Sequence, residues 1–283
     1  MAPTNPISIT LLGEGHLPQM MVLSREAGWN QQEADWRLFL TEGLVFGALD
    51  DGGVVGSAAI LPYGEDIAWI SMVLVRRSHR KRGLGSLLLQ RCLDELDRRR
   101  RIACLDATPI GEPLYRSLGF EGSLRLTRWQ GEGNGPVTPP GESSPVPLSR
   151  SVALNAAVAL DAAAFGAERR PILTSFSARL PTAAWMTQDE RGAVLGRPGD
   201  RASQVGPLLA ADEQTAIALL TAALAQLPGP VFIDVLDQRR AVAEFLRARG
   251  FTPQRSFLRM IRNASRTLGD IARLHAIAGP EFG

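Results

Sequence analysis

The chain has 283 residues, of which 45% are hydrophobic and 21% are charged, with 31 Lys and Arg against 29 Asp and Glu. This composition excludes a mostly disordered or collagen-like chain and leaves room for one large domain or two ordinary ones. The formal net charge of +2 excludes the chain-wide basic field of a general nucleic-acid binder, so any anion site must be local.

The remaining composition predicts a cytoplasmic protein without a metal. Cys92 and Cys104 are too few for a disulfide framework. The N-terminus lacks the pattern of a signal peptide, and no stretch is apolar for about 18 residues, so we expect no membrane association. The 3 histidines are scattered without ligand spacing, which argues against a metal site.

The first half alternates short strand-like runs with amphipathic helices. The segment Asp51-Gly52-Gly53 is a hairpin signal between two strands. In chain order we expect a strand at 7–12, helices at 19–26 and 31–42, strands at 44–50, 54–62 and 67–75, a helix at 84–96, a strand at 102–107, a helix at 112–118 and a strand at 123–129.

A segment dense in Gly, Pro and Ser, Gln130 to Ser149, interrupts this pattern and is typical of a linker. The flanking pieces are of similar size and both mix strands with helices, which is the pattern of an α/β or α+β domain. We therefore expect an N-terminal domain at 1–130, a linker at 131–149 and a C-terminal domain at 150–283.

The two halves are also related by a repeat at a fixed offset of 131 positions. The segment LYRSLGF at 114–120 aligns with FLRARGF at 245–251, which places Gly119 on Gly250. The same offset carries Leu89, Leu93 and Leu96 onto Leu220, Leu224 and Leu227, and Arg128 onto Arg259. A helical period and a helix-ending Gly-Phe that recur together indicate a tandem duplication.

The most informative stretch is the turn that joins the strand at 67–75 to the following helix. Its residues Arg80 to Ser86 open a helix, so several backbone N–H groups converge on one point. Gly83 and Gly85 leave room for a phosphate to approach, and basic side chains surround it. The turn matches neither a Walker loop nor the GxGxxG dinucleotide motif. It is predicted to hold an anion.

At these residues the chain resembles the GCN5-related N-acetyltransferase (GNAT) family, whose [QR]-x-x-G-x-[GA] motif is present as Arg80-x-x-Gly83-x-Gly85. A strand and then Pro113-Leu-Tyr115-Arg-Ser-Leu-Gly119-Phe120 follow at the right distance. The chain also resembles a tandem-domain subset of that family, the YitH-like acetyltransferases. The resemblance implies two GNAT-like domains, each a mixed, mostly antiparallel sheet flanked by helices.

The resemblance further implies which residues bind acetyl-CoA. The loop backbone would bind the pyrophosphate, the strand edge at 73–75 would pair with the pantetheine arm, and an N–H near Val73 would stabilise the oxyanion that forms when an amine attacks the thioester. Tyr115 matches the family tyrosine that protonates the leaving thiolate. The implied cofactor-binding residues are Val73, Leu74, Val75, Arg80, Lys81, Arg82, Gly83, Leu84, Gly85 and Ser86.

The sequence does not single out a general base. The strand positions where family members often carry a carboxylate or histidine hold Trp69 and Ser71 here. Glu26, Glu65 and Asp66 are the candidates, acting directly or through a chain of water molecules.

Two segments are candidates for binding the acceptor. By resemblance, Trp29, Asn30 and Trp36 fall in the acceptor region of the family, although tryptophans are more often core residues. Asp161 and Arg169 lie in a polar segment that resembles a recurrent segment of the YitH-like subset.

The second copy is degenerate, because the offset places Ala211, Gln214, Ala216 and Leu246 where the first copy has its motif residues and its tyrosine. The first hypothesis is an acyltransferase that moves an acetyl group from acetyl-CoA to a primary amine of a small molecule by direct transfer. The alternatives are a catalytically silent acyl-CoA sensor that binds a partner protein, and a nucleic-acid binder built on the basic runs at 76–82 and 98–101.

Overall fold

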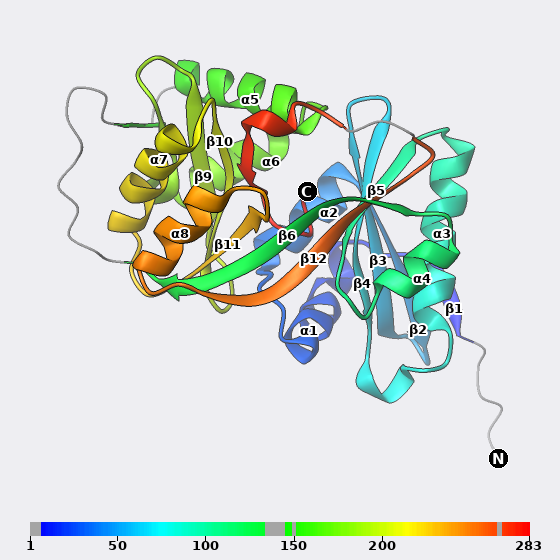
Figure 1. The fold of residues 1–283 in the computed structure, drawn as a ribbon. Helices are drawn as coiled ribbons and strands as arrows, with labels where there is room; N and C mark the ends of the chain where they lie inside the picture. The colour runs from blue at the N-terminus through cyan, green and yellow to red at the C-terminus, as the bar shows by residue number, and fades with distance from the viewer. Residues whose placement is uncertain (1–6, 134–144, 149–150, 265–267) are drawn as a thin grey trace. The chain divides into compact units, whose positions relative to one another are not determined.

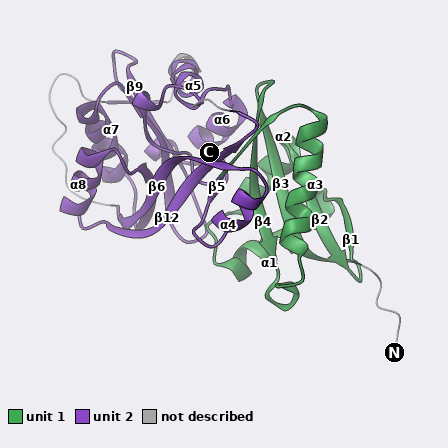
Figure 2. Cartoon of the chain, turned by 45° about the vertical axis from the view of Figure 1, so that its right-hand side comes forward, with its two compact units in different colours: residues 1–105 green, residues 106–283 purple. Residues whose placement is uncertain are grey.

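The computed structural model describes residues 7–133, 145–148, 151–264 and 268–283. The chain forms two compact units, residues 1–105 and 106–283, which Figure 2 colours separately. Both units are α/β in composition, with long and mostly antiparallel sheets and helices packed on them (Figure 1). The fold class predicted from the sequence is confirmed.

Unit 1 is a five-stranded sheet with three helices. The strands follow the order β1-β2-β3-β4-β5, with antiparallel neighbours except for the parallel pair β4 and β5. Helices α1 and α2 pack against β3, and α3 packs against β2, β3 and β4. The elements are β1 (Ser8–Leu11), α1 (Leu17–Ala27), α2 (Glu33–Glu42), β2 (Leu44–Asp50), β3 (Gly53–Tyr63), β4 (Ile67–Val75), α3 (Leu84–Arg98) and β5 (Ile102–Ala107).

Local sequence explains these elements. The hairpin between β2 and β3 turns on Asp51 and Gly52, both with positive φ, as the sequence predicts. Helix α1 ends at Gly28 in the left-handed conformation, which satisfies its last carbonyls. Every residue from Val54 to Leu61 of β3 is buried, so both faces of the sheet are covered in unit 1.

Unit 2 contains the remaining elements and a sheet of the order β12-β6-β11-β13-β10-β9-β8-β7. Its core lies between this sheet and helices α7 and α8 and includes Trp129, Leu220 and Ile233. The elements are α4 (Glu112–Ser117), β6 (Glu121–Glu132), β7 (Val146–Pro147), α5 (Ser151–Phe165), α6 (Arg170–Arg179), β8 (Trp185–Met186), β9 (Gly192–Arg197), β10 (Ser203–Ala210), α7 (Glu213–Ala225), β11 (Pro230–Leu236), α8 (Arg240–Ala248), β12 (Thr252–Arg262) and β13 (Leu274–Ala276).

The structure displays the internal repeat. Strands β6 and β12 begin at residues 121 and 252, and the glycines before them, Gly119 and Gly250, share the left-handed conformation with φ of 85° and 81°. The leucines that the repeat aligns in α3 and around α7 are all buried. The two arginines that the repeat aligns form equivalent pairs of hydrogen bonds with an aspartate. Arg128 donates to both carboxylate oxygens of Asp234 at 2.8 Å, and Arg259 donates to both of Asp106 at 3.0 Å.

The compact units and the sequence repeats divide the chain at different places. Strand β6, the last of the first repeat, lies in unit 2 between β12 and β11. The expected linker falls largely on 134–144, outside the described residues, but its ends at 130–132 and 146–147 are strand. The domain boundaries at 130 and 150 stay a prediction drawn from the repeat.

Candidate active site

Strands β4 and β5 of unit 1 separate along their length. Their parallel pairing covers Ile67 to Trp69 of β4 and Ile102 to Cys104 of β5. Further along, the register of β4 against β3 shifts beside Met72, whose φ is +53°. This is a β-bulge, which re-aims the backbone of the bulged strand. The Ser57 hydroxyl holds it by donating to the Met72 carbonyl at 2.8 Å. The bulge therefore lies at the strand edge predicted to meet the thioester.

The loop after β4, which we call the cradle, is the segment that the sequence predicts to bind an anion. It spans the eight residues 76–83, and Lys81 and Gly83 have positive φ of 60° and 76°. Gly83 is the N-cap of α3, and no side chain caps the helix. The first helical bond runs from the Leu87 N–H to the Gly83 carbonyl at 3.0 Å, so the preceding N–H groups have no partner within the helix. They can bind an anion.

Gly83 and Gly85 of this loop border free space. A Cβ built on Gly83 would meet no atom within 4 Å, and one built on Gly85 would meet only Val75 Cγ2 at 3.8 Å. The protein's own packing therefore does not require a glycine at position 85. Exposed Arg80, Lys81 and Arg82 add positive charge beside this free space.

Two carboxylates fix the start of the loop. Glu26, on the last turn of α1, accepts a hydrogen bond from the Arg77 N–H and one of 3.3 Å from Arg76 Nε. The Asp50 carboxylate forms a hydrogen bond of 2.9 Å with His79 Nε2. The backbone hydrogen bond from Arg77 lowers the pKa of Glu26, assisted by Arg76. A carboxylate with a lowered pKa is a weaker base, so its contacts favour a positioning role for Glu26.

The other two base candidates lie at the opposite end of β4. Glu65 and Asp66 are exposed residues of the turn between β3 and β4. About six residues of extended strand separate them from Val73, a distance on the order of 20 Å. Proton transfer from an amine near Val73 to either carboxylate would require a chain of water molecules.

The acceptor candidates of unit 1 differ in exposure. Trp36 is fully buried, and its indole Nε1 donates to Ser24 Oγ at 2.9 Å, so it belongs to the core. Asn30 is also buried, whereas Trp29 is partly exposed. The sequence did not single out two further residues, Gln31 and Ser71. Gln31 Oε1 and Ser71 Oγ are buried without a hydrogen-bond partner among the described residues.

Tyr115 lies on α4, within unit 2. Its ring is half-buried and packs edge-on against Phe120, with centroids 6.0 Å apart. A Cβ on Gly111 would lie 2.8 Å from Tyr115 Cε2, so the absence of a side chain at Gly111 leaves room for the ring.

Asp161 and Arg169 bind each other in the interior of unit 2. Both are fully buried, and the guanidinium contacts the two carboxylate oxygens at 2.7 and 2.8 Å. Arg169 also donates to the carbonyls of Phe282 and Gly283. These contacts are those of a structural ion pair, and neither side chain offers an exposed surface to an acceptor.

The second copy has lost the cradle by deletion as well as substitution. Only Ala211 and Asp212 connect β10 to α7, where eight residues connect β4 to α3. The Asp212 carboxylate accepts a hydrogen bond from the Thr215 N–H at 2.8 Å and so caps α7. This N–H hydrogen bond lowers the pKa of Asp212. The Asp212 carboxylate thus occupies the N-terminus of α7, whereas no side chain of the described residues caps the N-terminus of α3.

The groove of the second copy is filled by the chain itself. Strands β10 and β11 pair in parallel from Ser203 to Val205, as β4 and β5 do in the first copy. Beyond that point β13 lies between them: Ala276 is opposite Leu208 of β10 and Val235 of β11. In the first copy, the corresponding gap is where the resemblance places the pantetheine arm. Among the described residues, the second copy therefore leaves no open strand edge between β10 and β11.

A bulged strand that splays from its parallel neighbour and leads into a glycine-rich helix start defines the class of GCN5-related acetyltransferases. Two family profiles match the chain: the Acetyltransferase (GNAT) family over residues 16–120, and an Acetyltransferase (GNAT) domain over residues 157–276. The chain therefore belongs to the GNAT family and carries two of its domains in tandem.

Comparisons with individual proteins agree. The chain is 25% identical over 247 residues to the uncharacterised N-acetyltransferase YitH of Bacillus subtilis (strain 168), across 85% of this chain and 86% of YitH. A solved structure from Pyrococcus horikoshii shares the fold with a TM-score of 0.82 and 19% identity, over 100% of this chain and 98% of that one. A tandem GNAT protein from the clavulanic acid biosynthesis pathway gives a TM-score of 0.65 at 15% identity, over 92% and 99%.

The described residues contain neither a membrane-spanning helix nor a cluster of metal-ligating side chains. No helix in that part of the chain is long and apolar enough to cross a membrane. No group of three or more His, Cys, Asp or Glu side chains there could hold a metal ion.

Proposed function

We propose that the chain is an acetyl-CoA-dependent N-acetyltransferase whose first copy transfers the acetyl group directly to a primary amine of a small molecule. The observation that carries the proposal is the uncapped N-terminus of α3, with free space at Gly83 and Gly85 and positive charge at Arg80 to Arg82. The family uses acetyl-CoA, and this cradle suits its pyrophosphate.

In this proposal the bulge of β4 supplies the electrostatic catalysis. The N–H near Val73 donates to the thioester oxygen as the amine nitrogen attacks the carbonyl carbon. The carbon–sulfur bond then breaks, and the Tyr115 hydroxyl gives its proton to the leaving thiolate. The protonated amine loses one proton before attack, to water or to a carboxylate reached through water. Its nitrogen loses a second proton from the tetrahedral intermediate, and that proton returns through water to the Tyr115 oxygen. Ser71 and Gln31 offer unpartnered polar atoms to the acceptor.

The experiment follows thiol release with a library of small amines and identifies the products by mass spectrometry. The proposal expects release of CoA only with an acceptor present, together with a product heavier by one acetyl group. If the protein binds acetyl-CoA but releases no thiol with any amine, transfer is refuted and the sensor hypothesis is supported. If it does not bind acetyl-CoA, both hypotheses fail.

A further inference from the structure

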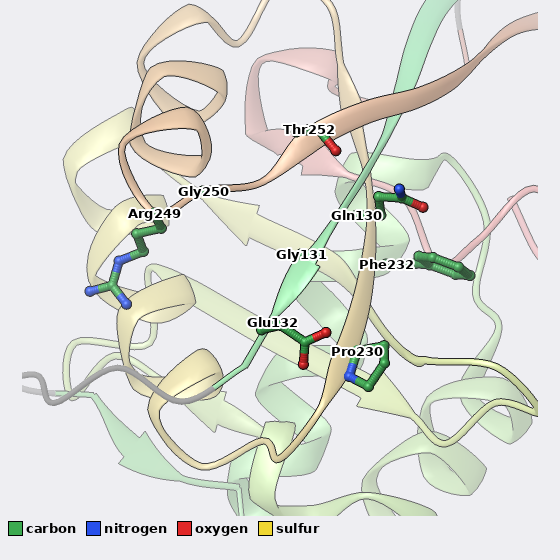
Figure 3. A pocket seen from close by; sticks show the side chains of 8 residues that line it. All are labelled: Gln130, Gly131, Glu132, Pro230, Phe232, Arg249, Gly250 and Thr252. Atoms are coloured by element: carbon green, nitrogen blue, oxygen red, sulfur yellow. The ribbon is translucent and has the colours of Figure 1, made fainter.

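Unit 2 contains a pocket of about 430 Å³, which we call the β6 pocket. Figure 3 shows the side chains of Gln130 and Phe232 pointing to the same side of the strands, whereas Arg249 points away. The Arg249 guanidinium instead lies 4.8 Å from the centroid of the Phe245 ring. The lining residues are Gln130, Gly131, Glu132, Pro230, Phe232, Arg249, Gly250 and Thr252.

Arginines occupy the same sheet region next to this pocket. In the strand register, Arg128 of β6 is opposite both Asp234 of β11 and Arg255 of β12. Asp234 binds Arg128 through both carboxylate oxygens at 2.8 Å. Arg128 is thereby neutralised, and its guanidinium also lies 5.1 Å from the centroid of the Phe232 ring.

Arg255 is left with an unbalanced charge. It is half-buried, and no carboxylate of the described residues forms an ion pair with it. Burial lowers the pKa of its guanidinium, and repulsion from Arg128 lowers it further, while Asp234 offsets only part of this. Like charges opposite each other on neighbouring strands are destabilising. The fold therefore keeps a positive charge here that its own groups do not neutralise.

The Gln254 side chain forms hydrogen bonds with the side chains of both Arg255 and Gln130. Its Oε1 accepts from Arg255 Nε at 3.3 Å, and its Nε2 donates to Gln130 Oε1 at 2.9 Å. Among the described residues, these contacts leave the two terminal nitrogens of Arg255 and the amide nitrogen of Gln130 available as donors. Arg255 is thus linked through Gln254 to Gln130, which lines the pocket together with the Phe232 ring. A guanidinium, an amide donor and a ring in this order are suited to an oxyanion carried on an apolar body.

We propose that the β6 pocket, together with Arg255, is a second ligand site that binds a small molecule bearing a carboxylate or a phosphate. The site lies in unit 2 and does not depend on acetyl transfer. Arg255 binds the oxyanion, Gln130 donates the second hydrogen bond, and the Phe232 ring packs against the apolar part of the molecule. In the proposed complex, the negative charge of the ligand neutralises the Arg255 guanidinium.

The test uses the full chain with ¹⁵N-labelled arginine and follows the Arg255 Nε–Hε signal by NMR, assigned by its loss in Arg255→Gln. Benzoate and inorganic phosphate are the two probes, and whichever saturates the signal at the lower concentration identifies the class of anion. We expect a saturable shift, weakened at least threefold in Gln130→Ala and unchanged in Arg240→Gln, which removes an exposed arginine of α8.

Thermal unfolding of the variants separates binding from structure. Arg255→Gln should unfold at the same temperature as the wild type or higher, because it removes the repulsion with Arg128. The proposal is overturned if both probes shift the Arg255 signal only linearly, no more than they shift that of Arg240. It is also overturned if Arg255→Gln unfolds at a lower temperature, since Arg255 would then have a structural role.

Discussion

Replacing Gly85 by alanine tests whether this glycine is required for folding or for acetyl-CoA binding. The added Cβ would lie 3.8 Å from Val75 Cγ2, an ordinary contact, so the folded protein accommodates it. Because alanine is the better helix former, the free energy of unfolding should stay the same or rise by up to about 1 kcal/mol. If Gly85 served only the fold, acetyl-CoA binding would not change.

The methyl group would, however, project into the space proposed for the pyrophosphate. Displacing the phosphate from one or two backbone N–H groups costs about 1.5–3 kcal/mol, the range for a hydrogen bond to a charged group. The dissociation constant for acetyl-CoA should therefore rise about 10- to 100-fold in calorimetry. Gly15→Ala is the matched control, since its Cβ would meet no atom within 4 Å and it lies outside the cradle. Unchanged binding in Gly85→Ala would refute the placement of the pyrophosphate.

Three further variants test other groups. Tyr115→Phe should lower kcat by about 100-fold, the lower end for a general acid, with the acetyl-CoA affinity preserved; an unchanged kcat would remove the acid role. Glu26→Gln should weaken acetyl-CoA binding about tenfold because the Arg77 N–H would then donate to a neutral amide oxygen and the ion pair with Arg76 would be lost, with the acidic limb of the pH profile unmoved; a shifted limb would instead identify a base. Burial lowers the pKa of His275 to about 4, so the unfolded state binds more protons between that value and 6.5, and stability falls as the pH drops through this window. Between pH 7 and 5 the wild type should lose about 2 kcal/mol more in urea unfolding than His275→Gln, and equal losses would contradict the burial of a neutral imidazole.

Much of unit 1 could be predicted because its signals are local. Strands β2, β4 and β5 have the bounds that the sequence predicts, since apolar runs end there at turn-forming or charged residues. The cradle could be found for the same reason: its glycines and basic residues lie within one short segment. The hairpin at Asp51 and Gly52 likewise depends only on neighbouring residues.

What could not be predicted depends on residues far apart in the chain. Strand β13 has only three residues, Leu274 to Ala276, too few for any periodic pattern, and becomes a strand because β10 and β11 leave a gap. The loop before α7 is shortened to two residues, and a fixed offset of 131 positions does not reveal this deletion. Ser71 and Gln31 have no distinguishing pattern either, since an unpartnered polar atom is defined by its surroundings in space.

We propose that one of the two GNAT copies binds acetyl-CoA and the other does not. The stoichiometry of acetyl-CoA binding to the full chain, measured by isothermal titration calorimetry, tests this difference between the copies. The open cradle at Gly83, against the Asp212 cap and the β13 strand of the second copy, predicts one molecule per chain and none in the double variant Arg80→Ala, Gly83→Glu. Two molecules per chain, or one that remains in the double variant, would contradict it.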